Sequence, residues 1–143
     1  MMAAVQTGSC LCGDCSFTAR PKHDAGVCHC AMCRKWSGGM FISVESETPL
    51  EFVTGAPVSV YPSSAWGERL FCGRCGGHLA WRAKDGHATY VSIQCFADPA
   101  QFELTQQIFI DCKPGNYAIA NKTQTMTEAE FMAMVAPSTE GNA

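Results

Sequence analysis

The sequence has no run of lysine or arginine, and charged residues make up only 16% of its 143 positions, with a formal net charge of −3. A nucleic-acid-binding surface would show a cluster of basic residues, so we expect no nucleic-acid partner. No apolar segment approaches the length that spans a membrane. Residues 1–6 have no basic stretch followed by an apolar run, so we expect neither a secretory signal nor a membrane partner.

Several catalytic motifs are also missing. The sequence has no Ser-His-Asp order, no phosphate-binding loop and no dinucleotide fingerprint. Cysteine, in contrast, is abundant, with ten residues. Many cysteines without an export signal indicate a reducing compartment, and they favour metal binding over a disulfide framework. We therefore expect a cytoplasmic metalloprotein.

The pattern of apolar residues predicts a mainly β fold. Length and a hydrophobic share of 47% fit one zinc-binding domain over 1–143, with a core at about 8–136 and a frayed tail at 137–143. Lys84-Asp85-Gly86 between two strands is typical of a hairpin. Helices are expected only at Met32–Ser37, before Gly38-Gly39, and at Glu128–Val135, after a capping box of Thr127 and Glu130. The expected strands are short: Ser16–Arg20, Met40–Val44, Val58–Pro62, Arg69–Cys72, His78–Ala83, Thr89–Phe96 and Gln107–Lys113.

The cysteines fall into three groups and three single residues. The groups are Cys10 and Cys12; Cys28, Cys30 and Cys33; and Cys72 and Cys75. The single residues, Cys15, Cys95 and Cys112, each lie in an alternating apolar pattern. Since a buried free cysteine behaves as a small apolar residue, we expect these three in the core of strands.

The group Cys28, Cys30 and Cys33 is the most informative. Three thiols within six residues, spaced C-x-C-x-x-C, can converge on one soft metal ion. Zinc prefers four ligands in a tetrahedron, so a local set of three either takes a fourth ligand from elsewhere or leaves one position open. An open position is typical of a catalytic zinc site.

The spacing allows two ways to distribute the other cysteines. Cys72 and Cys75, followed by Gly76-Gly77, have the form of a zinc knuckle. Combined with Cys10 and Cys12, they would make a four-cysteine site and leave the group of three open. Cys30 and Cys33 could equally combine with Cys72 and Cys75, which would leave Cys10, Cys12 and Cys28 together. Spacing favours the first arrangement only modestly.

Three motifs together resemble one enzyme family. They are Gly8-Ser-Cys10-Leu-Cys12-Gly13, then Cys28-His-Cys30-Ala-Met-Cys33-Arg-Lys-Trp-Ser-Gly38, then Ser63-Ser64 through Arg69-Leu-Phe-Cys72-Gly-Arg-Cys75-Gly76. The sequence from about Gly8 to Tyr117 is similar to the glutathione-dependent formaldehyde-activating enzyme family, which also includes centromere protein V. This resemblance implies small antiparallel sheets stapled by zinc. It also implies a structural zinc on Cys10, Cys12, Cys72 and Cys75, and a catalytic zinc on Cys28, Cys30 and Cys33.

The resemblance further implies a carbon–sulfur lyase similar to S-(hydroxymethyl)glutathione synthase. A zinc held by three thiolates lowers the pKa of a bound thiol, which suits the addition of glutathione sulfur to formaldehyde. Glutathione carries two carboxylates, for which Arg34 and Arg69 are the candidate partners, with Lys35 interpreted as a solvated charge. Ser63, Ser64 and Trp66 are candidates to line the substrate site.

Two positions depart from the family pattern, so the identity of the thiol and aldehyde substrates is left open. The family often has histidine where this chain has Gln107, and tryptophan where it has Asn116. His29, between two of the candidate ligands, is expected to point away from the metal; the alternatives are a fourth ligand or an acid–base group. Two rival functions are a scaffold in which both zincs are structural and a redox sensor that uses Cys28, Cys30 and Cys33.

Overall fold

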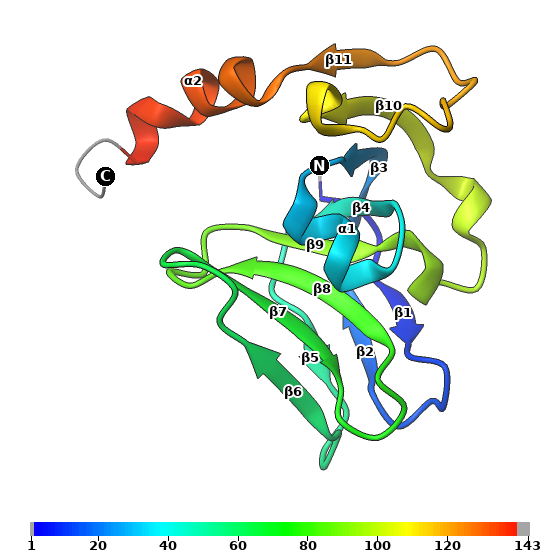
Figure 1. The fold of residues 1–143 in the computed structure, drawn as a ribbon. Coiled ribbons are helices and arrows are strands. Elements are labelled where there is room, and N and C mark those ends of the chain that lie inside the picture. The colour runs from blue at the N-terminus through cyan, green and yellow to red at the C-terminus, as the bar shows by residue number, and fades with distance from the viewer. Residues whose placement is uncertain (1, 140–143) are drawn as a thin grey trace. The chain divides into compact units, whose positions relative to one another are not determined.

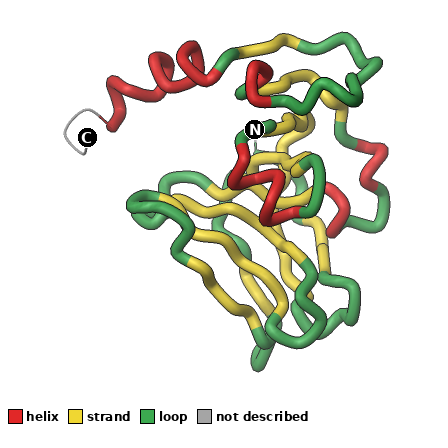
Figure 2. The backbone as a smooth tube through the Cα atoms, in the orientation of Figure 1, coloured by secondary structure: helices red, strands yellow, loops and turns green. Residues whose placement is uncertain are grey.

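The structure is a computed structural model that describes residues 2–139, and it is mainly β, with short helices (Figures 1 and 2). The chain divides into two compact units. The first unit consists of residues 2–25 and 42–103, and the second of residues 26–41 and 104–139. Within residues 2–139, no helix combines the length and the apolar character needed to cross a bilayer.

The first unit contains a small antiparallel sheet in the order β1-β2-β5. The strands are β1 (Gln6–Ser9), β2 (Ser16–Ala19) and β5 (Glu51–Phe52). Phe17 is 1% exposed, and its ring lies 5.5 Å from that of Phe52. A Cβ atom on Gly8, which pairs with Phe17, would lie only 2.6 Å from that ring, so glycine is needed at this position. The sheet therefore packs around one buried aromatic residue.

The larger sheet of the first unit has the order β3-β4-β9-β8-β7-β6. Its core includes Leu70, Leu79 and Val91, each at most 1% exposed. In Figure 1 the neighbouring strands β6, β7 and β8 are drawn in green. The bounds are β3 (Pro21–Cys28, of which residues 21–25 belong here), β4 (Phe41–Ser46, of which residues 42–46 belong here), β6 (Val58–Tyr61), β7 (Gly67–Cys72), β8 (His78–Ala83) and β9 (Thr89–Ser92).

The second unit carries the end of β3, the helices α1 (Ala31–Ser37) and α2 (Glu128–Thr139), and the strands β10 (Glu103–Ile108, of which residues 104–108 belong here) and β11 (Gln124–Met126). β11 is parallel to β10, and β10 lies next to β3. Helix α1 ends at Gly38, whose φ of 75° is favoured by glycine. At the start of α2, Thr127 Oγ1 accepts from Glu130 N at 3.1 Å, and Glu130 Oε1 accepts from Thr127 N at 2.8 Å.

Much of this agrees with the sequence-based predictions. The mainly β class, the strand His78–Ala83, the turn with a positive φ at Gly86, the short helix before Gly38 and the capping box are confirmed. The strands β1, β3, β5 and β11 were not predicted. Helix α2 continues beyond the predicted end at Val135 to Thr139, so the tail expected to fray at 137–143 is helical up to 139. Residues 140–143 lie outside the described residues.

Two predicted strands end early, and this corrects the positions of two cysteines. The strand expected over Thr89–Phe96 stops at Ser92, whose Oγ accepts from Gln94 N at 3.3 Å and starts a 3-10 turn over Ile93–Cys95. The strand expected over Gln107–Lys113 stops at Ile108, because Phe109 has a φ of 56° and leads into a 3-10 turn over Ile110–Cys112. Cys95 and Cys112 therefore lie half-buried on helical turns rather than in strands. Cys15 is fully buried, as expected, directly before β2.

Candidate metal centres

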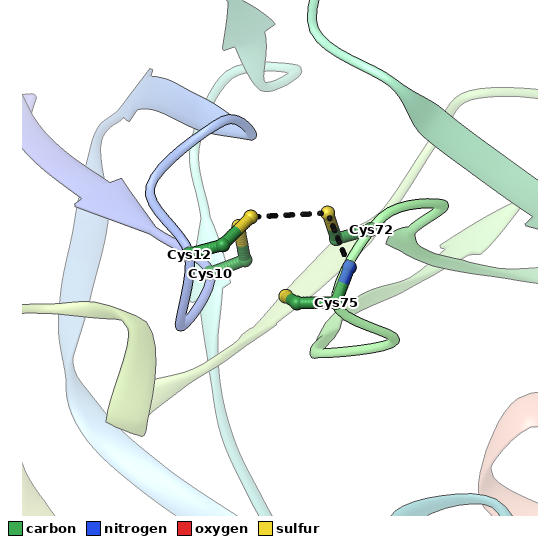
Figure 3. Close-up of side chains that lie close together, drawn as sticks. All are labelled: Cys10, Cys12, Cys72 and Cys75. Atoms are coloured by element: carbon green, nitrogen blue, oxygen red, sulfur yellow. Dashed lines mark hydrogen bonds between the residues drawn. The ribbon is translucent and has the colours of Figure 1, made fainter.

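Four cysteines of the first unit form one group. Cys10 and Cys12 lie in the loop after β1, Cys72 is the last residue of β7, and Cys75 lies in the turn between β7 and β8. The four sulfur atoms lie within 4.8 Å of one another. Cys12 Sγ is 3.6 Å from Cys10 Sγ and 3.7 Å from Cys72 Sγ. Figure 3 shows the two pairs of side chains directed at each other from their separate loops.

Backbone amides and glycines shape the turn that carries Cys72 and Cys75. Cys72 O accepts from Gly76 N at 2.9 Å, and Gly76 has a φ of 76°, which glycine adopts without strain. Cys72 Sγ accepts from the backbone N–H of Cys75 at 3.4 Å and of Arg74 at 3.3 Å. The N–H of Cys75, with a smaller effect from that of Arg74, lowers the pKa of Cys72 to about 6. The turn thus favours a thiolate, which is the form that binds metal.

The loop that carries Cys10 and Cys12 is built in a similar way. Cys10 O accepts from Gly13 N at 3.3 Å, with Gly13 at a φ of 86°, and Cys10 Sγ accepts from Cys15 N at 3.4 Å. An ion pair of 2.9 Å between Asp14 and Arg74 links this loop to the turn of Cys72 and Cys75. The pair is exposed, so it contributes little to stability, but it joins the two loops that supply the sulfurs.

Three cysteines of the second unit form the other group. Cys28 ends β3, Cys30 is the N-cap of α1, and Cys33 lies in its first turn. Their sulfurs also lie within 4.8 Å of one another. Cys30 Sγ accepts from the backbone N–H of Cys33 at 3.3 Å, so the residue that starts the helix is also a candidate ligand. Within the described chain, no fourth His, Cys, Asp or Glu side chain belongs to this group.

The three sulfurs influence one another strongly. Hydrogen bonds from the thiols of Cys28 and Cys33 lower the pKa of Cys30 to about 2. The same contacts, first with Cys30 and then with Cys33, together with burial, raise the pKa of Cys28. Ionisation of one of these sulfurs therefore opposes ionisation of its neighbour. A soft cation removes that conflict, because it lets all three sulfurs carry charge, and thiolates are ligands that zinc prefers. The donor set fits zinc.

His29 is fully buried between these cysteines, at 0% exposure. Its Nε2 lies 2.8 Å from Gln107 Oε1, and its backbone N–H donates to Ile108 O at 3.1 Å. Gln107, which sequence reasoning noted only as a departure from the family pattern, is thus the partner of His29. The alternative of His29 as a fourth ligand finds no support in the geometry, since His29 is not part of the metal-binding group.

The candidate substrate residues lie in both units. Arg34, in the second, donates from Nε to His29 O at 2.9 Å. Ser64, Trp66 and Arg69 lie in the first. Ser64 Oγ accepts from Gly67 N at 2.9 Å and closes the turn between β6 and β7. Trp66 is 55% exposed and packs edge-on against Trp81, with ring centroids 6.1 Å apart, whereas Arg69 is only 3% exposed.

Sequence reasoning placed Cys15 in the core but missed its position beside the four-cysteine group. Burial, and after it contacts with Cys72 and Cys10, raise the pKa of Cys15 to about 12, so it remains a neutral thiol. The C-x-x-C spacing from Cys12 to Cys15 was a signal that this thiol would lie near the others. Thr123 and Tyr117, which lie near His29 and Gln107, carried no sequence signal, because their positions depend on contacts between distant parts of the chain.

Comparison with known proteins gives a consistent result. Residues 5–112 match the family model described as glutathione-dependent formaldehyde-activating enzyme. A protein of Schizosaccharomyces pombe named as an uncharacterized lyase is 31% identical over 132 residues, which cover 90% of this chain and 95% of that protein. The crystal structure of a Rhodobacter sphaeroides protein is similar in fold, with a TM-score of 0.56 and 21% identity over 64% of this chain and 88% of that one.

Proposed function

Because the chain belongs to the glutathione-dependent formaldehyde-activating enzyme family, we propose that it is a zinc-dependent carbon–sulfur lyase similar to S-(hydroxymethyl)glutathione synthase. It joins formaldehyde, or a related aldehyde, to glutathione or a similar thiol, and it catalyses the reverse reaction. The observation that carries this proposal is the group of three sulfurs within 4.8 Å of one another, to which no fourth metal-binding side chain of the described residues belongs.

The reaction needs no oxidant or reductant. The thiol sulfur forms a bond to the carbonyl carbon, the π electron pair of the carbonyl moves to its oxygen, and the thiol proton ends on that oxygen. The proton must leave sulfur before or during the attack, because the thiolate is the nucleophile. Zinc bound at Cys28, Cys30 and Cys33 would stabilise the substrate as a thiolate near neutral pH.

The protein residues hold and orient the reacting groups. Cys28, Cys30 and Cys33 are the ligands of the catalytic metal, and none of them is the nucleophile. Arg34 follows the last ligand directly and has its Nε fixed on His29 O, which leaves its two terminal nitrogens as donors for a substrate carboxylate. Arg69, Ser64 and Trp66 belong to the first unit, and their role in substrate binding stays a prediction of the family resemblance.

The four-cysteine group has a different role in this proposal. Cys10, Cys12, Cys72 and Cys75 hold a structural zinc, which needs no open position. Cys10 and Cys75 lie 65 residues apart in the sequence, so one ion would close a long loop of the chain. Their main effect is on folding, because metal binding at such a site contributes directly to the free energy of unfolding.

Exchange between free formaldehyde and its glutathione adduct, measured by NMR exchange spectroscopy, tests the proposal. Zinc-loaded protein is expected to accelerate this exchange over the buffer rate. The matched variants are Cys33→Ser, which removes one candidate ligand, and Cys112→Ser, which alters a half-buried cysteine outside both groups. The proposal fails if the zinc-loaded protein leaves the exchange rate unchanged, or if the two variants lose the same share of the activity.

A further inference from the structure

The loop that carries Cys28 and Cys30 is fixed through the residue between them. His29 is fully buried, and its backbone and the Nε2 atom of its side chain have partners in the second unit. Its N–H donates to Ile108 O at 3.1 Å, and its carbonyl oxygen accepts from Arg34 Nε at 2.9 Å. Hydrogen bonds therefore fix the peptide groups on both sides of His29, and these groups link it to Cys28 and Cys30.

The side chain of His29 continues this support into a chain of hydrogen bonds. Gln107 Nε2 donates to Thr123 Oγ1 at 2.8 Å, which directs Gln107 Oε1 toward His29. An amide oxygen can only accept, so His29 Nε2 carries the hydrogen in this 2.8 Å bond. The ring of Tyr117 lies near the imidazole, with centroids 6.4 Å apart. Gln107 is 6% exposed, so water competes little for these bonds.

Part of this support comes from residues outside the family match. The match ends at residue 112, whereas Thr123 directly precedes β11, and Gln107 lies on β10, paired with Thr125 of β11. Residues 113–126 thus reach the cysteine loop in two ways, through the ring of Tyr117 beside His29 and through the hydroxyl of Thr123, which the amide of Gln107 links to His29.

We propose that His29, Gln107 and Thr123 are positioning residues that set the geometry, and with it the affinity, of the metal site formed by Cys28, Cys30 and Cys33. The inference rests on the proposed function, since it concerns the same site. Groups that orient metal ligands without touching the metal typically change affinity about 10- to 100-fold when they are lost. None of the three residues binds metal or substrate in this proposal.

The first test uses a matched pair at Thr123 in the full chain. Thr123→Val keeps the shape but removes the hydroxyl that accepts from Gln107, whereas Thr123→Ser keeps the hydroxyl. We expect Thr123→Val to weaken zinc binding at the three-cysteine site about three- to tenfold, as the loss of one partly buried hydrogen bond implies, and Thr123→Ser to bind zinc as the wild type does. Competition with a chromophoric chelator measures the affinity. Thr125→Val, at an exposed position of the same strand, is the control and is expected to bind as the wild type does.

A second test reads the geometry directly. Cobalt replaces zinc as the probe, and its visible absorption and its sulfur-to-cobalt charge-transfer bands report the arrangement of the ligands. His29→Leu is expected to shift the bands of the three-cysteine site and to lower its affinity tenfold or more, while the bands of the four-cysteine site stay unchanged. His29→Gln, whose amide can still donate to Gln107, is expected to recover part of the affinity.

The outcomes separate this inference from the function on which it rests. Unchanged zinc affinity and unchanged cobalt bands in folded Thr123→Val protein would overturn it, even if His29→Leu did not fold. Equal losses in Thr123→Val and Thr125→Val would also overturn it, because a general destabilisation would then explain both. If the variants behave as expected but the wild-type protein does not accelerate the exchange of formaldehyde with glutathione, the positioning role stands and the proposed enzymatic function fails.

Discussion

The two cysteine groups differ in how the chain assembles them. The group of four takes one pair from the loop after β1 and the other from the end of β7 and the turn that follows it, so distant segments meet at the sulfurs. The group of three lies within six residues and needs no distant segment to supply a sulfur. Its geometry is instead fixed from outside, through the contacts of His29 with β10 and of Gln107 with Thr123. A metal at the group of four would stabilise the fold, whereas at the group of three the fold would determine the geometry of the metal site.

Removal of one sulfur from the group of four should have the largest effect. Cys72→Ser is expected to lower the free energy of unfolding by about 4 kcal/mol or more, because the loss of a structural metal is among the most destabilising changes known for small domains. Thermal unfolding followed by circular dichroism, with metal content measured in parallel, checks this. Cys112→Ser is the control and should stay close to the wild type. A Cys72→Ser protein as stable as that control would contradict the comparison.

The equivalent change in the group of three should spare the fold and remove the activity. Cys33→Ser is expected to lower the zinc content from two equivalents to one and to leave the melting temperature within a few degrees of the wild type. The exchange rate of formaldehyde with glutathione should fall by more than the roughly 100-fold that the loss of an outer partner costs. Steady metal content with full activity would show that the three sulfurs do not hold the catalytic ion.

A chelator should distinguish the two groups without any mutation. Three protein ligands hold an ion less tightly than four, so we expect a chelator to remove one zinc equivalent first, together with the catalytic activity. The second equivalent should leave only as the protein unfolds, because that site is coupled to folding. Simultaneous release of both ions, or two equally resistant ions, would favour the rival scaffold function, in which both metals are structural.

Near neutral pH, a cysteine outside both groups should show the smallest effect, because its contribution changes only above pH 9. Burial raises the pKa of Cys95 to about 12 from an ordinary value of 9.0. The unfolded chain releases this proton near pH 9, while the folded chain retains it until about pH 12. The contribution of the Cys95 thiol to stability is therefore fully present below pH 9 and is lost as the pH rises from 9 to 12. Between those values, Cys95→Ala should reduce the slope of unfolding free energy against pH by at most about 1.4 kcal/mol per pH unit. Identical slopes for the wild type and the variant would contradict this.

The features that sequence reasoning found are those written in short, local patterns. The knuckle at Cys72 and Cys75, the C-x-C-x-x-C loop, the capping box of Thr127 and the strand His78–Ala83 each depend on neighbours within a few positions. The grouping of Cys10 and Cys12 with Cys72 and Cys75 was favoured by spacing and by the family resemblance, and the structure brings these four together. Zinc itself remains a prediction.

The features that were missed depend on distant contacts or on a single residue that breaks a pattern. Strand β3 begins Pro21-Lys-His-Asp, where three exposed residues in a row hide the alternation. The run from Thr89 looked like one strand, but the hydroxyl of Ser92 ends it by capping the next turn. The hydrogen bond from Gln107 to Thr123 depends on the pairing of β11 with β10, and no local sequence pattern predicts that pairing.

Cys30, a candidate metal ligand, is also the N-cap of helix α1, so the three-cysteine group lies in one short stretch of the chain. The position of this stretch in the sequence determines when its sulfurs are made during synthesis. All three sulfurs of that loop have left the ribosome once Cys33 emerges, well before Cys75 completes the other set and long before Gln107 and Thr123 appear. A nascent chain can therefore bind an ion early, before the residues that fix the geometry of the site, Gln107 and Thr123, are translated. Maturation of this centre is expected to finish last, although its sulfurs are complete first.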